Sequence, residues 1–472
     1  MAEQTLEKTL TEYLKEGQVP LHMPGHKRRI SVTSSIDSHL DFTEIEETDD
    51  LHHATGILKQ AMDRTAALYG AKRTWYLVNG STCGNLAGIS AMTREGDEVI
   101  VARNCHRSVF HALQLRNLHV HWLVPPVLPE FGIDGSLSVS AVAEALEAYP
   151  SAKAVIVTSP TYEGVISDIR SIVRLAHAHG IPVFVDEAHG AHLGFGAFPA
   201  GAVQCGADLV VQSPHKTLFS STQTSWMHLQ GSLVDEKRVE QQLGIFETSS
   251  PSYPLLMSLD GCSAAWAEHG NEYCQRWLNM LADFDETAKH FHHLHILEHP
   301  HSKTYKDIFA FDPGKILIRS AMPGVKLQKL LHDRYRFTLE MAAGNHALAM
   351  TSAADDPVEI HRFALALDEI EHGIETTARE EGEESFSFAA VLPAVKMTIH
   401  DAVECDHQSL PLFEAQGRIA GEYVFLYPPG IPLIMPGEFI GIEQLETLRK
   451  AQIQGSEIRT SVSSGGSVLT CI

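Results

Sequence analysis

Residues 182–217, PVFVDEAHGAHLGFGAFPAGAVQCGADLVVQSPHKT, decide the fold that we predict for this chain. The stretch holds two apolar runs, PVFV (182–185) and ADLVVQ (207–212), and a third run, AVIVT (154–158), lies upstream. Helical patterns separate such runs along residues 57–215. Continuous apolar runs separated by helices are typical of a parallel sheet that is covered on both faces. The predicted class is therefore α/β.

Polar residues follow these runs, at the sheet edge where ligands bind in open parallel sheets. Asp186 comes directly after PVFV, and Lys216 follows ADLVVQ after a Ser-Pro-His turn. Two more segments belong to this edge: RNCHRS (103–108) follows the apolar run EVIV, and NGSTCG (79–84) leads into a helix of small residues. We expect one site here, built from segments far apart in the sequence.

Each of these residues has a structural and a functional interpretation. Ser81 or Thr82 can cap the helix that it opens, or can bind a phosphate together with backbone N–H groups. Asp186 can end a turn, or can pair with a pyridinium nitrogen. Lysine is usually solvated, but a lysine at a site can form a Schiff base with an aldehyde cofactor. The combination is more specific than any of its parts.

In this chain order, the combination resembles the fold-type I pyridoxal-phosphate (PLP) enzymes. The strings PLHMPGHKR, TEIEETDDLHHATGILKQA, NGSTCGNLA, RNCHRSVFHA, SPTYEG, VDEAHGAH and QSPHKTL are similar to the ornithine/lysine/arginine decarboxylase family. ETSSPSYPLLMSLD and YPPGIPLIMPGE continue the likeness, which covers about residues 19–450. It is greatest to the short Gram-positive-type branch, which has no N-terminal wing domain.

The resemblance implies a role for each matched residue. Lys216 becomes the Schiff-base lysine, Asp186 the partner of the protonated pyridine nitrogen, and His106 the residue stacked on one ring face, with Ala188 on the other. The phosphate would be held by Ser81, Thr82, Ser213 and His215. Ser252, in the SPSY string, would reach the phosphate or the neighbouring subunit's site.

The implied activity is decarboxylation of lysine, arginine or ornithine to CO2 and the polyamine-pathway amine, in a homodimer with a shared active site. Lys216, or a nearby group such as His215, would return the proton to Cα. Two other reactions on the same cofactor, transamination and β-elimination, stay open, because the fold does not decide among them. A non-catalytic regulatory relative is a third alternative. The chain departs from the pattern of the family at two positions: Arg107 stands where lysine is common, and Pro214 stands where a small residue is usual.

Two further clusters of polar residues stand out in the sequence. The acidic stretch Glu44–Asp50 is either a solvated charge run or places Asp49 or Asp50 against a cationic substrate across the dimer. Six histidines lie between residues 290 and 301, where we expect a surface helix and linker without a catalytic role. Cys105, beside His106, is interpreted as a packing residue. Near the C-terminus, Arg418 either contacts a substrate carboxylate or, as we expect, forms a structural ion pair with Glu422.

No metal site is predicted. His189 and His192 are spaced i, i+3 beside Asp186 and Glu187, but no HExxH or third-ligand motif accompanies them. A metal hydrolase is therefore a distant alternative. The seven cysteines contain no CxxC pair, and we expect a reducing cytoplasm.

The composition narrows the partners. The chain has 472 residues and a formal net charge of −23, which argues against binding nucleic acid or anionic membranes. It has no signal-peptide pattern and no apolar run of about 20 residues. The expected partner is a small-molecule amino acid.

We predict three parts: an N-terminal segment with the PLP-binding major domain over residues 1–300, an α+β region over 301–455, and a flexible Ser/Gly-rich tail over 456–472.

Overall fold

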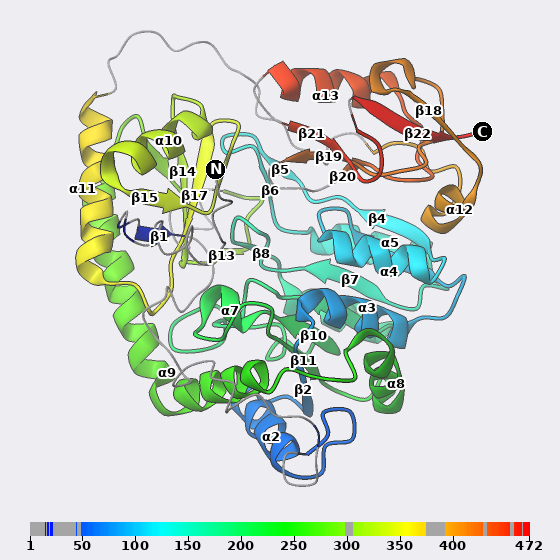
Figure 1. Ribbon diagram of the computed structural model, residues 1–472, viewed down its shortest axis with the longest axis horizontal. Helices are drawn as coiled ribbons and strands as arrows, with labels where there is room; N and C mark the ends of the chain where they lie inside the picture. The colour runs from blue at the N-terminus through cyan, green and yellow to red at the C-terminus, as the bar shows by residue number, and fades with distance from the viewer. Residues whose placement is uncertain are drawn as a thin grey trace, which may run out of the picture.

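The computed structural model describes residues 15, 17, 19–21, 44, 49–297, 305–373, 392–427, 432–453, 457–464 and 466–472. Within these residues, a seven-stranded sheet forms the centre of the molecule (Figure 1). Its spatial order is β2 (Arg73–Leu77), β11 (Ser225–Leu229), β10 (Leu209–Gln212), β9 (Val183–Asp186), β7 (Val155–Thr158), β3 (Glu98–Ala102) and β4 (His119–Leu123). Strand β11 is antiparallel to both of its neighbours, and β10, β9, β7, β3 and β4 run parallel. The predicted α/β class is confirmed.

Both faces of the sheet are buried, as the continuous apolar runs predict. Along β9, Phe184 packs into one core while Val183 and Val185 pack into the other. The helices beside these strands are α2 (Ile57–Tyr69), α3 (Gly80–Met92), α4 (Arg107–Leu115), α5 (Val139–Ala148), α6 (Ile169–Ala178), α7 (Pro214–Thr217) and α8 (Glu236–Phe246). Helices α5 and α6 contribute to the core on the Val183 side, and α3 to the core on the Phe184 side.

Helix α3 lies unusually close to the sheet because it carries glycines on its inner face. A Cβ atom at Gly88 would come within 2.5 Å of the Phe184 ring, and one at Gly84 within 2.8 Å of Val211. Larger residues would therefore push the helix outward. This close packing fixes the N-terminus of α3 beside the ends of β9 and β10.

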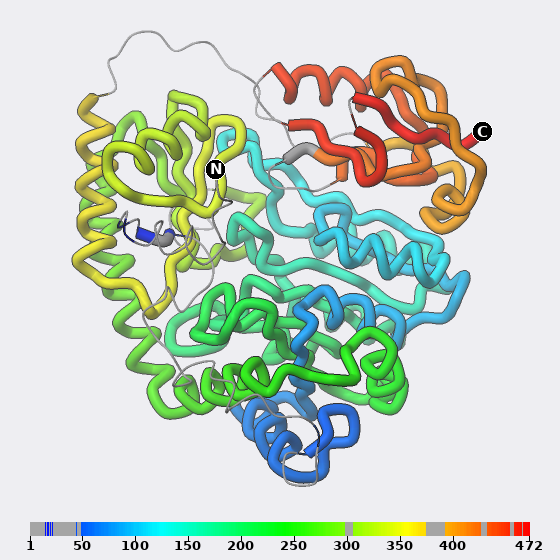
Figure 2. Tube along the Cα trace, in the orientation of Figure 1, coloured from blue at the N-terminus to red at the C-terminus, as the bar shows by residue number. Residues whose placement is uncertain are grey.

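A second, smaller sheet lies against one end of the first. It has the order β12 (His295–Ile296), β14 (Lys315–Arg319), β17 (His346–Met350) and β16 (Met341–Ala343). The long helix α9 (Tyr253–Ala288) runs along the molecule and packs on α11 (Pro357–Gly373), as the continuous trace in Figure 2 shows. The remaining elements of this region are α10 (Gly324–Tyr335) and three short strand pairs: β1 (Val19–Leu21) with β15 (Phe337–Leu339), β13 (Ala310–Phe311) with β8 (Val165–Ile166), and β5 (Val127–Leu128) with β6 (Ile133–Asp134).

The described residues after 391 form a separate C-terminal unit with its own apolar core. Its elements are α12 (Ile399–Glu404), β18 (His407–Pro411), η2 (Leu412–Glu414), β19 (Val424–Tyr427), β20 (Pro432–Ile434), α13 (Ile442–Ile453), β21 (Glu457–Thr460) and β22 (Ser467–Cys471). Arg103, at the end of β3, ties this unit to the central sheet through the backbone carbonyls of Pro432 and Leu433 and the carboxylate of Glu438.

The expectation of a flexible tail over residues 456–472 is wrong for the described part. Strand β22 pairs with β18 and β21 pairs with β19, and the Val468 side chain is fully buried. Glu422 holds the tail by accepting hydrogen bonds from three of its backbone N–H groups, those of Val462, Ser463 and Leu469. Arg418 instead donates to Gln408, so the expected ion pair between Arg418 and Glu422 does not form.

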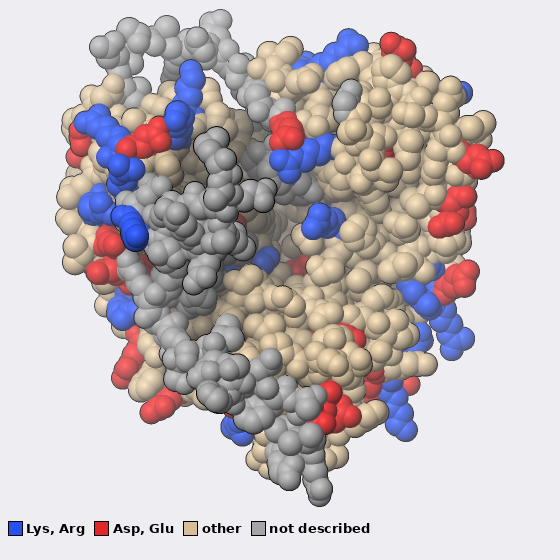
Figure 3. Space-filling model, in the orientation of Figure 1, with Lys and Arg blue, Asp and Glu red and all other residues tan. Residues whose placement is uncertain are grey.

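The boundary proposed at residue 300 stays a prediction. Strand β12 precedes it and pairs with β14 beyond it. On the face in Figure 3, basic and acidic side chains are interspersed, and the visible described residues form no continuous basic patch. Of the described helices, none is long and apolar enough to cross a membrane.

Candidate active site

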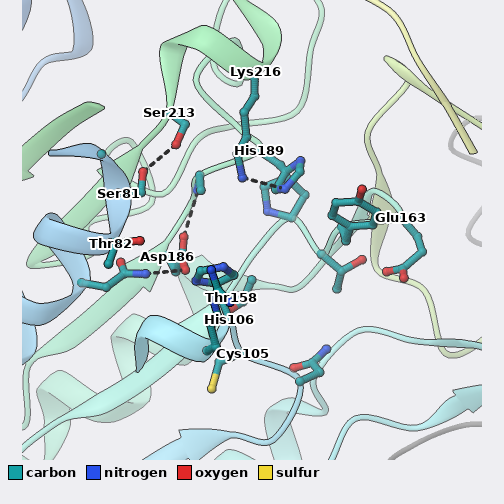
Figure 4. A pocket seen from close by; sticks show the side chains of 18 of the residues that line it. Ser81, Thr82, Cys105, His106, Thr158, Glu163, Asp186, His189, Ser213 and Lys216 are labelled. Atoms are coloured by element: carbon teal, nitrogen blue, oxygen red, sulfur yellow. Dashed lines mark hydrogen bonds between the residues drawn. The ribbon is translucent and has the colours of Figure 1, made fainter. Parts of the chain in front are cut away.

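A cavity of about 290 Å³ opens at the carboxyl ends of β7, β9 and β10. All eight residues predicted to bind the cofactor line it: Ser81, Thr82, His106, Asp186, Ala188, Ser213, His215 and Lys216. Figure 4 shows Lys216 extending from α7 toward His189, with Asp186 and His106 on the opposite side of the cavity. The structure thus brings together residues that the sequence spreads over 136 positions, from 81 to 216.

Asp186 ends β9 and is almost fully buried. Its Oδ2 accepts a hydrogen bond of 2.7 Å from the Asn85 amide, and its Oδ1 accepts one of 3.1 Å from the Ala188 backbone N–H. Asn85 also donates to Ser108, at 2.8 Å. These bonds hold the carboxylate in one orientation toward the cavity.

His106 occupies the N-cap position of α4. Its Nδ1 accepts from the Ser108 backbone N–H at 3.2 Å and lies 2.8 Å from the Ser108 hydroxyl. Because the backbone group can only donate, Nδ1 carries no proton and a neutral ring has its hydrogen on Nε2. Although the ring has surface exposed to the cavity, its protein surroundings desolvate it and lower the pKa of His106 to about 4; the Asp186 carboxylate opposes this shift, and the charge of Arg107 adds to it. The ring is therefore neutral at pH 7.

The N-terminus of α3 faces the same cavity. Gly80 has φ of +74°, and the preceding Asn79 makes no side-chain cap, so within the described part of the chain the helix begins without a side-chain acceptor. Ser81 Oγ lies 2.6 Å from Ser213 Oγ and 2.9 Å from Ser225 Oγ. Uncapped N–H groups beside a cluster of hydroxyls form a suitable site for an anion.

Lys216 and His189 meet across the cavity. Lys216 Nζ lies 2.9 Å from His189 Nε2, and burial lowers the pKa of Lys216, although the carboxylates of Asp186 and Glu340 oppose this. His215, next to the lysine, donates from Nδ1 to the carbonyl of Thr224 at 2.8 Å. The depressed pKa favours the neutral amine, which is the nucleophilic form of a lysine.

The sequence analysis missed Lys315. This lysine opens β14, is 1% exposed, and places Nζ 3.0 Å from His189 Nδ1. Its signal in the sequence is a lysine at the start of an apolar strand, KILIR (315–319). That pattern alone does not indicate which cavity the lysine approaches.

The residues considered as metal ligands in the sequence have other partners in the structure. His192 Nε2 lies 2.9 Å from Asp312 Oδ1, whereas His189 contacts the two lysines. Glu187 accepts from Gln212 and from the Ala202 backbone, and its burial raises the pKa of this carboxyl to about 8. The motif around Asp186 therefore gives no support to a metal hydrolase.

A group of metal-ligand type does occur in the C-terminal unit. Cys405, His407 and Cys471 place one donor atom each within 4.8 Å of one another. All three hydrogen-bond to the carbonyl of Ala402, in the last turn of α12. That shared acceptor accounts for their convergence.

Asp49 lies outside the cavity lining and performs a structural task. Its carboxylate accepts from five backbone N–H groups, those of Asp50, Thr55, Gly56, Leu58 and Lys59, and so closes the N-terminus of α2. Burial opposes ionisation, but these bonds outweigh it and lower the pKa of Asp49. Asp49 therefore has no carboxylate oxygen left unbonded for a substrate. Asp50, which accepts from the His52 N–H, also lies outside the lining, and its role across a dimer stays a prediction.

The other predicted residues are placed as follows. Cys105 is buried and lines the cavity as a thiol, since burial raises its pKa. Ser252 is the N-cap residue of α9 and does not line the cavity of its own chain. In the histidine cluster, the backbones of His292 and His293 donate to Glu371, while His299 and His301 lie outside the described residues.

The residues of the cavity fit PLP on three counts. The uncapped start of α3 suits the phosphate, and the oriented Asp186 carboxylate suits a pyridinium N–H. In addition, three lining groups, Thr158 Oγ1, Asn104 Oδ1 and Asn85 Oδ1, are buried without a hydrogen-bond partner in the described structure, as expected where a polar ligand completes a site.

Comparisons with known proteins agree with this fit. The family described as "Orn/Lys/Arg decarboxylase, major domain" matches residues 4–319, and "Orn/Lys/Arg decarboxylase, C-terminal domain" matches residues 382–454. "Uncharacterized protein YaaO" of Bacillus subtilis is 35% identical, covering 96% of each chain. "Arginine decarboxylase" of Bacillus subtilis is 31% identical, covering 96% of this chain and 95% of the relative.

Solved structures show the same fold. The lysine decarboxylase LdcF of Francisella novicida superposes with a TM-score of 0.78 at 18% identity, over 98% of this chain and 82% of the other. Lysine decarboxylase A of Pseudomonas aeruginosa gives 0.75 at 20% identity, over 99% and 82%. A more distant neighbour, a NifS-like protein, gives 0.54 at 12% identity, over 70% and 93%, and a structure described as SPT with PLP gives 0.52 at 16% identity, over 68% and 78%.

The fold is that of the fold-type I class, and the residues of the cavity fit the PLP-dependent enzymes of that class. Within that class, the chain belongs to the Orn/Lys/Arg decarboxylase family, and it is an amino-acid decarboxylase of this type. The predicted family and enzyme class are confirmed. The alternatives of a transaminase, a β-eliminating lyase and a non-catalytic relative receive no support from these comparisons.

Proposed function

We propose that this chain attaches PLP through Lys216 and decarboxylates a basic amino acid to CO2 and the corresponding amine. The observation that carries the proposal is the convergence of Lys216, Asp186 and His106 on one cavity, beside an uncapped helix N-terminus. When bound, the cofactor supplies a cationic ring that accepts the electron pair left at Cα as CO2 departs.

The protein's own groups orient the reaction and protect it from water. Asp186 holds a proton at the ring nitrogen, because a buried carboxylate favours a cationic partner. Neutral His106 and Ala188 would hold the cofactor ring between them. The α3 N-terminus, with Ser81, Thr82, Ser213 and His215, would anchor the phosphate. Lys216, once it carries a proton, would return that proton to Cα after CO2 has left, which leaves its amine neutral again.

The substrate is a basic amino acid, and the named relatives favour arginine. Four bacterial relatives at 29–31% identity carry the name arginine decarboxylase, whereas the relatives named lysine decarboxylase are 21–23% identical. The formal charge of −23 is compatible with a cationic substrate.

We also propose a cytoplasmic homodimer with a shared active site. All seven cysteines are free thiols, which fits a reducing compartment. Asp50 and Ser252 lie outside the cavity of their own chain, which leaves them available to a neighbouring one. Sedimentation of the purified protein tests the dimer.

The function is tested by incubating purified protein and PLP with a panel of amino acids while CO2 and the amine are measured together. Equal amounts of CO2 and agmatine from arginine are expected. A keto acid, or a β-fragment with ammonia, would instead identify a different reaction.

A further inference from the structure

His189 bridges two lysines, and its two ring nitrogens contact one each. Nε2 lies 2.9 Å from Lys216 Nζ, and Nδ1 lies 3.0 Å from Lys315 Nζ. His189 is 7% exposed, and its ring packs edge-on against Tyr162 with 5.2 Å between centroids. The three groups therefore form one buried chain of hydrogen bonds that begins at Lys216 and ends away from the cavity.

Counting donors and acceptors limits the charge of this chain. A neutral imidazole has one N–H and one lone pair, and an ammonium group can only donate. If both lysines were ammonium ions, the ring would need two lone pairs, which it lacks. The contacts can all be hydrogen bonds only when one lysine is a neutral amine that accepts the ring N–H. With a neutral ring, the chain thus carries at most one positive charge.

More carboxyl groups act on Lys315 than on Lys216, which favours the charge on Lys315. The groups that act on its ammonium are Asp312, Glu340 and Glu163, which favour the charge, and Lys216, which opposes it. The aliphatic stem of Lys315 is fixed by Gly164, where φ is +110° and a Cβ atom would lie 2.7 Å from Lys315 Cγ. Lys216 is acted on by two carboxylates, Asp186 and Glu340. Burial lowers the pKa of both lysines, and that of Lys315 falls to about 8.

The histidine itself stays neutral. Burial lowers the pKa of His189 well below its ordinary value, and four cationic or titratable neighbours act in the same direction: Lys216, Lys315, His106 and His215. A proton that leaves Lys216 therefore does not remain on the ring.

We propose that Lys315 is a positioning residue which, through His189, keeps Lys216 a neutral nucleophile. A proton leaves Lys216 Nζ for His189 Nε2 while the Nδ1 proton passes to Lys315 Nζ. The total charge of +1 is conserved, and the ring changes tautomer from Nδ1–H to Nε2–H. Nothing else is consumed. The inference deepens the proposed function, because it explains how the lysine proposed to attach the cofactor is prepared for attack.

The experiment uses the cofactor-free protein, so that it does not depend on decarboxylation. Limiting acetic anhydride labels Lys216 in proportion to its neutral amine, and peptide mass spectrometry reads the labelling between pH 6 and pH 10. Lys315→Met should reduce labelling at pH 7 at least about tenfold, because Lys216 becomes the ammonium donor to His189. Lys315→Arg, which still donates to Nδ1, should keep the wild-type profile. Thermal melting and circular dichroism check that each variant is folded.

A double-variant cycle separates the relay from a simple loss of nearby charge. In a His189→Phe background, Lys315→Met should change the labelling of Lys216 no further. If Lys315→Met lowers the labelling of Lys216 as much in the His189→Phe background as in the wild type, the proposal is overturned. Equal labelling of Lys216 in the wild type and in Lys315→Met would also overturn it.

A measurement on the unsubstituted protein keeps the proposal testable if Lys315→Met does not fold. Nitrogen NMR of protein with ¹⁵N-labelled histidine should show His189 as the neutral Nε2–H tautomer at pH 7. A neutral Nδ1–H tautomer or an imidazolium would contradict the assignment. Because neither measurement involves substrate, an inactive holoenzyme with the expected labelling would reject the proposed function alone.

Discussion

The helix starts of α2 and α3 lie on the same polypeptide 23 positions apart, at Ile57 and Gly80, yet they are completed in opposite ways. At α2, the Asp49 carboxylate accepts from the backbone N–H groups and closes the helix end. At α3, none of the described side chains caps the helix, and its first turn faces the cavity. An acidic side chain near a helix start is thus no sign of a ligand site. The helix start that lacks its own acceptor is the one able to take an external anion.

The largest effect on activity is expected from replacing Lys216, which faces α3 across the cavity. Lys216→Ala should remove turnover and the visible absorbance of bound PLP, because no amine remains at that position to attach the cofactor. Absorbance spectra and CO2 release measure both. Retained activity would refute the role of Lys216.

Replacing the strand-end carboxylate should have the next largest effect. Asp186→Asn should leave PLP bound but slow turnover by about two or more orders of magnitude, because the ring nitrogen loses its anionic partner. Glu187→Gln is a matched control, since this neighbouring buried carboxyl contacts Gln212 and Ala202 instead. Steady-state kinetics should show a small change in the control. Similar losses in both variants would indicate a general structural defect.

The anion site at α3 is tested with Ser81→Ala. Its hydroxyl belongs to a cluster with Ser213 and Ser225, so we expect PLP affinity to fall about tenfold, the cost of one hydrogen bond to a charged group. Titration of the cofactor-free protein with PLP gives the affinity. Asp49→Asn, at the start of α2, should leave the PLP affinity unchanged. A large loss of PLP affinity in Asp49→Asn would contradict the difference that we draw between the two helix starts.

The smallest effect is expected at α2, on stability. Asp49→Gly tolerates the observed φ of +69° but removes the acceptor, and should lower the free energy of unfolding by about 2 kcal/mol. Asp49→Asn keeps part of the cap and should cost less. Denaturant titration compares the variants, and KM should stay as in the wild type. A raised KM in Asp49→Asn would revive a substrate contact.

The stability from Asp49 should also depend on pH. Its folded pKa is lower than the ordinary value of 3.8, so the folded state favours the ionised form. This contribution is fully present above the unfolded-state pKa and is lost as pH falls through the folded pKa. The stability difference between wild type and Asp49→Gly should therefore shrink below about pH 4. A difference that is constant down to about pH 2 would contradict the capping role.

The sequence predicted best what is local to the strand ends. Asp186, Ala188, Ser213 and Lys216 follow buried strands directly, so a correct prediction of the strands places them at one edge. Lys315 was missed because it lies 126 positions from His189 and reaches it from a second sheet. The periodicity of a sequence does not predict contacts between residues that lie so far apart.

The structure differs from the prediction at two other places, Asp49 and the C-terminal tail, for reasons that composition does not reveal. Asp49 was interpreted within a charge run, yet its partners lie only one to ten positions away in the sequence. The serines and glycines of the tail predict flexibility, but Glu422 supplies acceptors for its backbone from 40 or more positions upstream. In both cases a single carboxylate helps to order the segment, and in the tail the strand pairing and the buried Val468 contribute as well.

The central claim is that Lys216, and not the other buried lysine nearby, carries the cofactor. Reduction of the PLP-loaded protein with borohydride fixes the cofactor to its lysine, and peptide mass spectrometry then locates it. The account predicts the pyridoxyl label on Lys216 with Lys315 unmodified. A label on Lys315 or on any other lysine would contradict it.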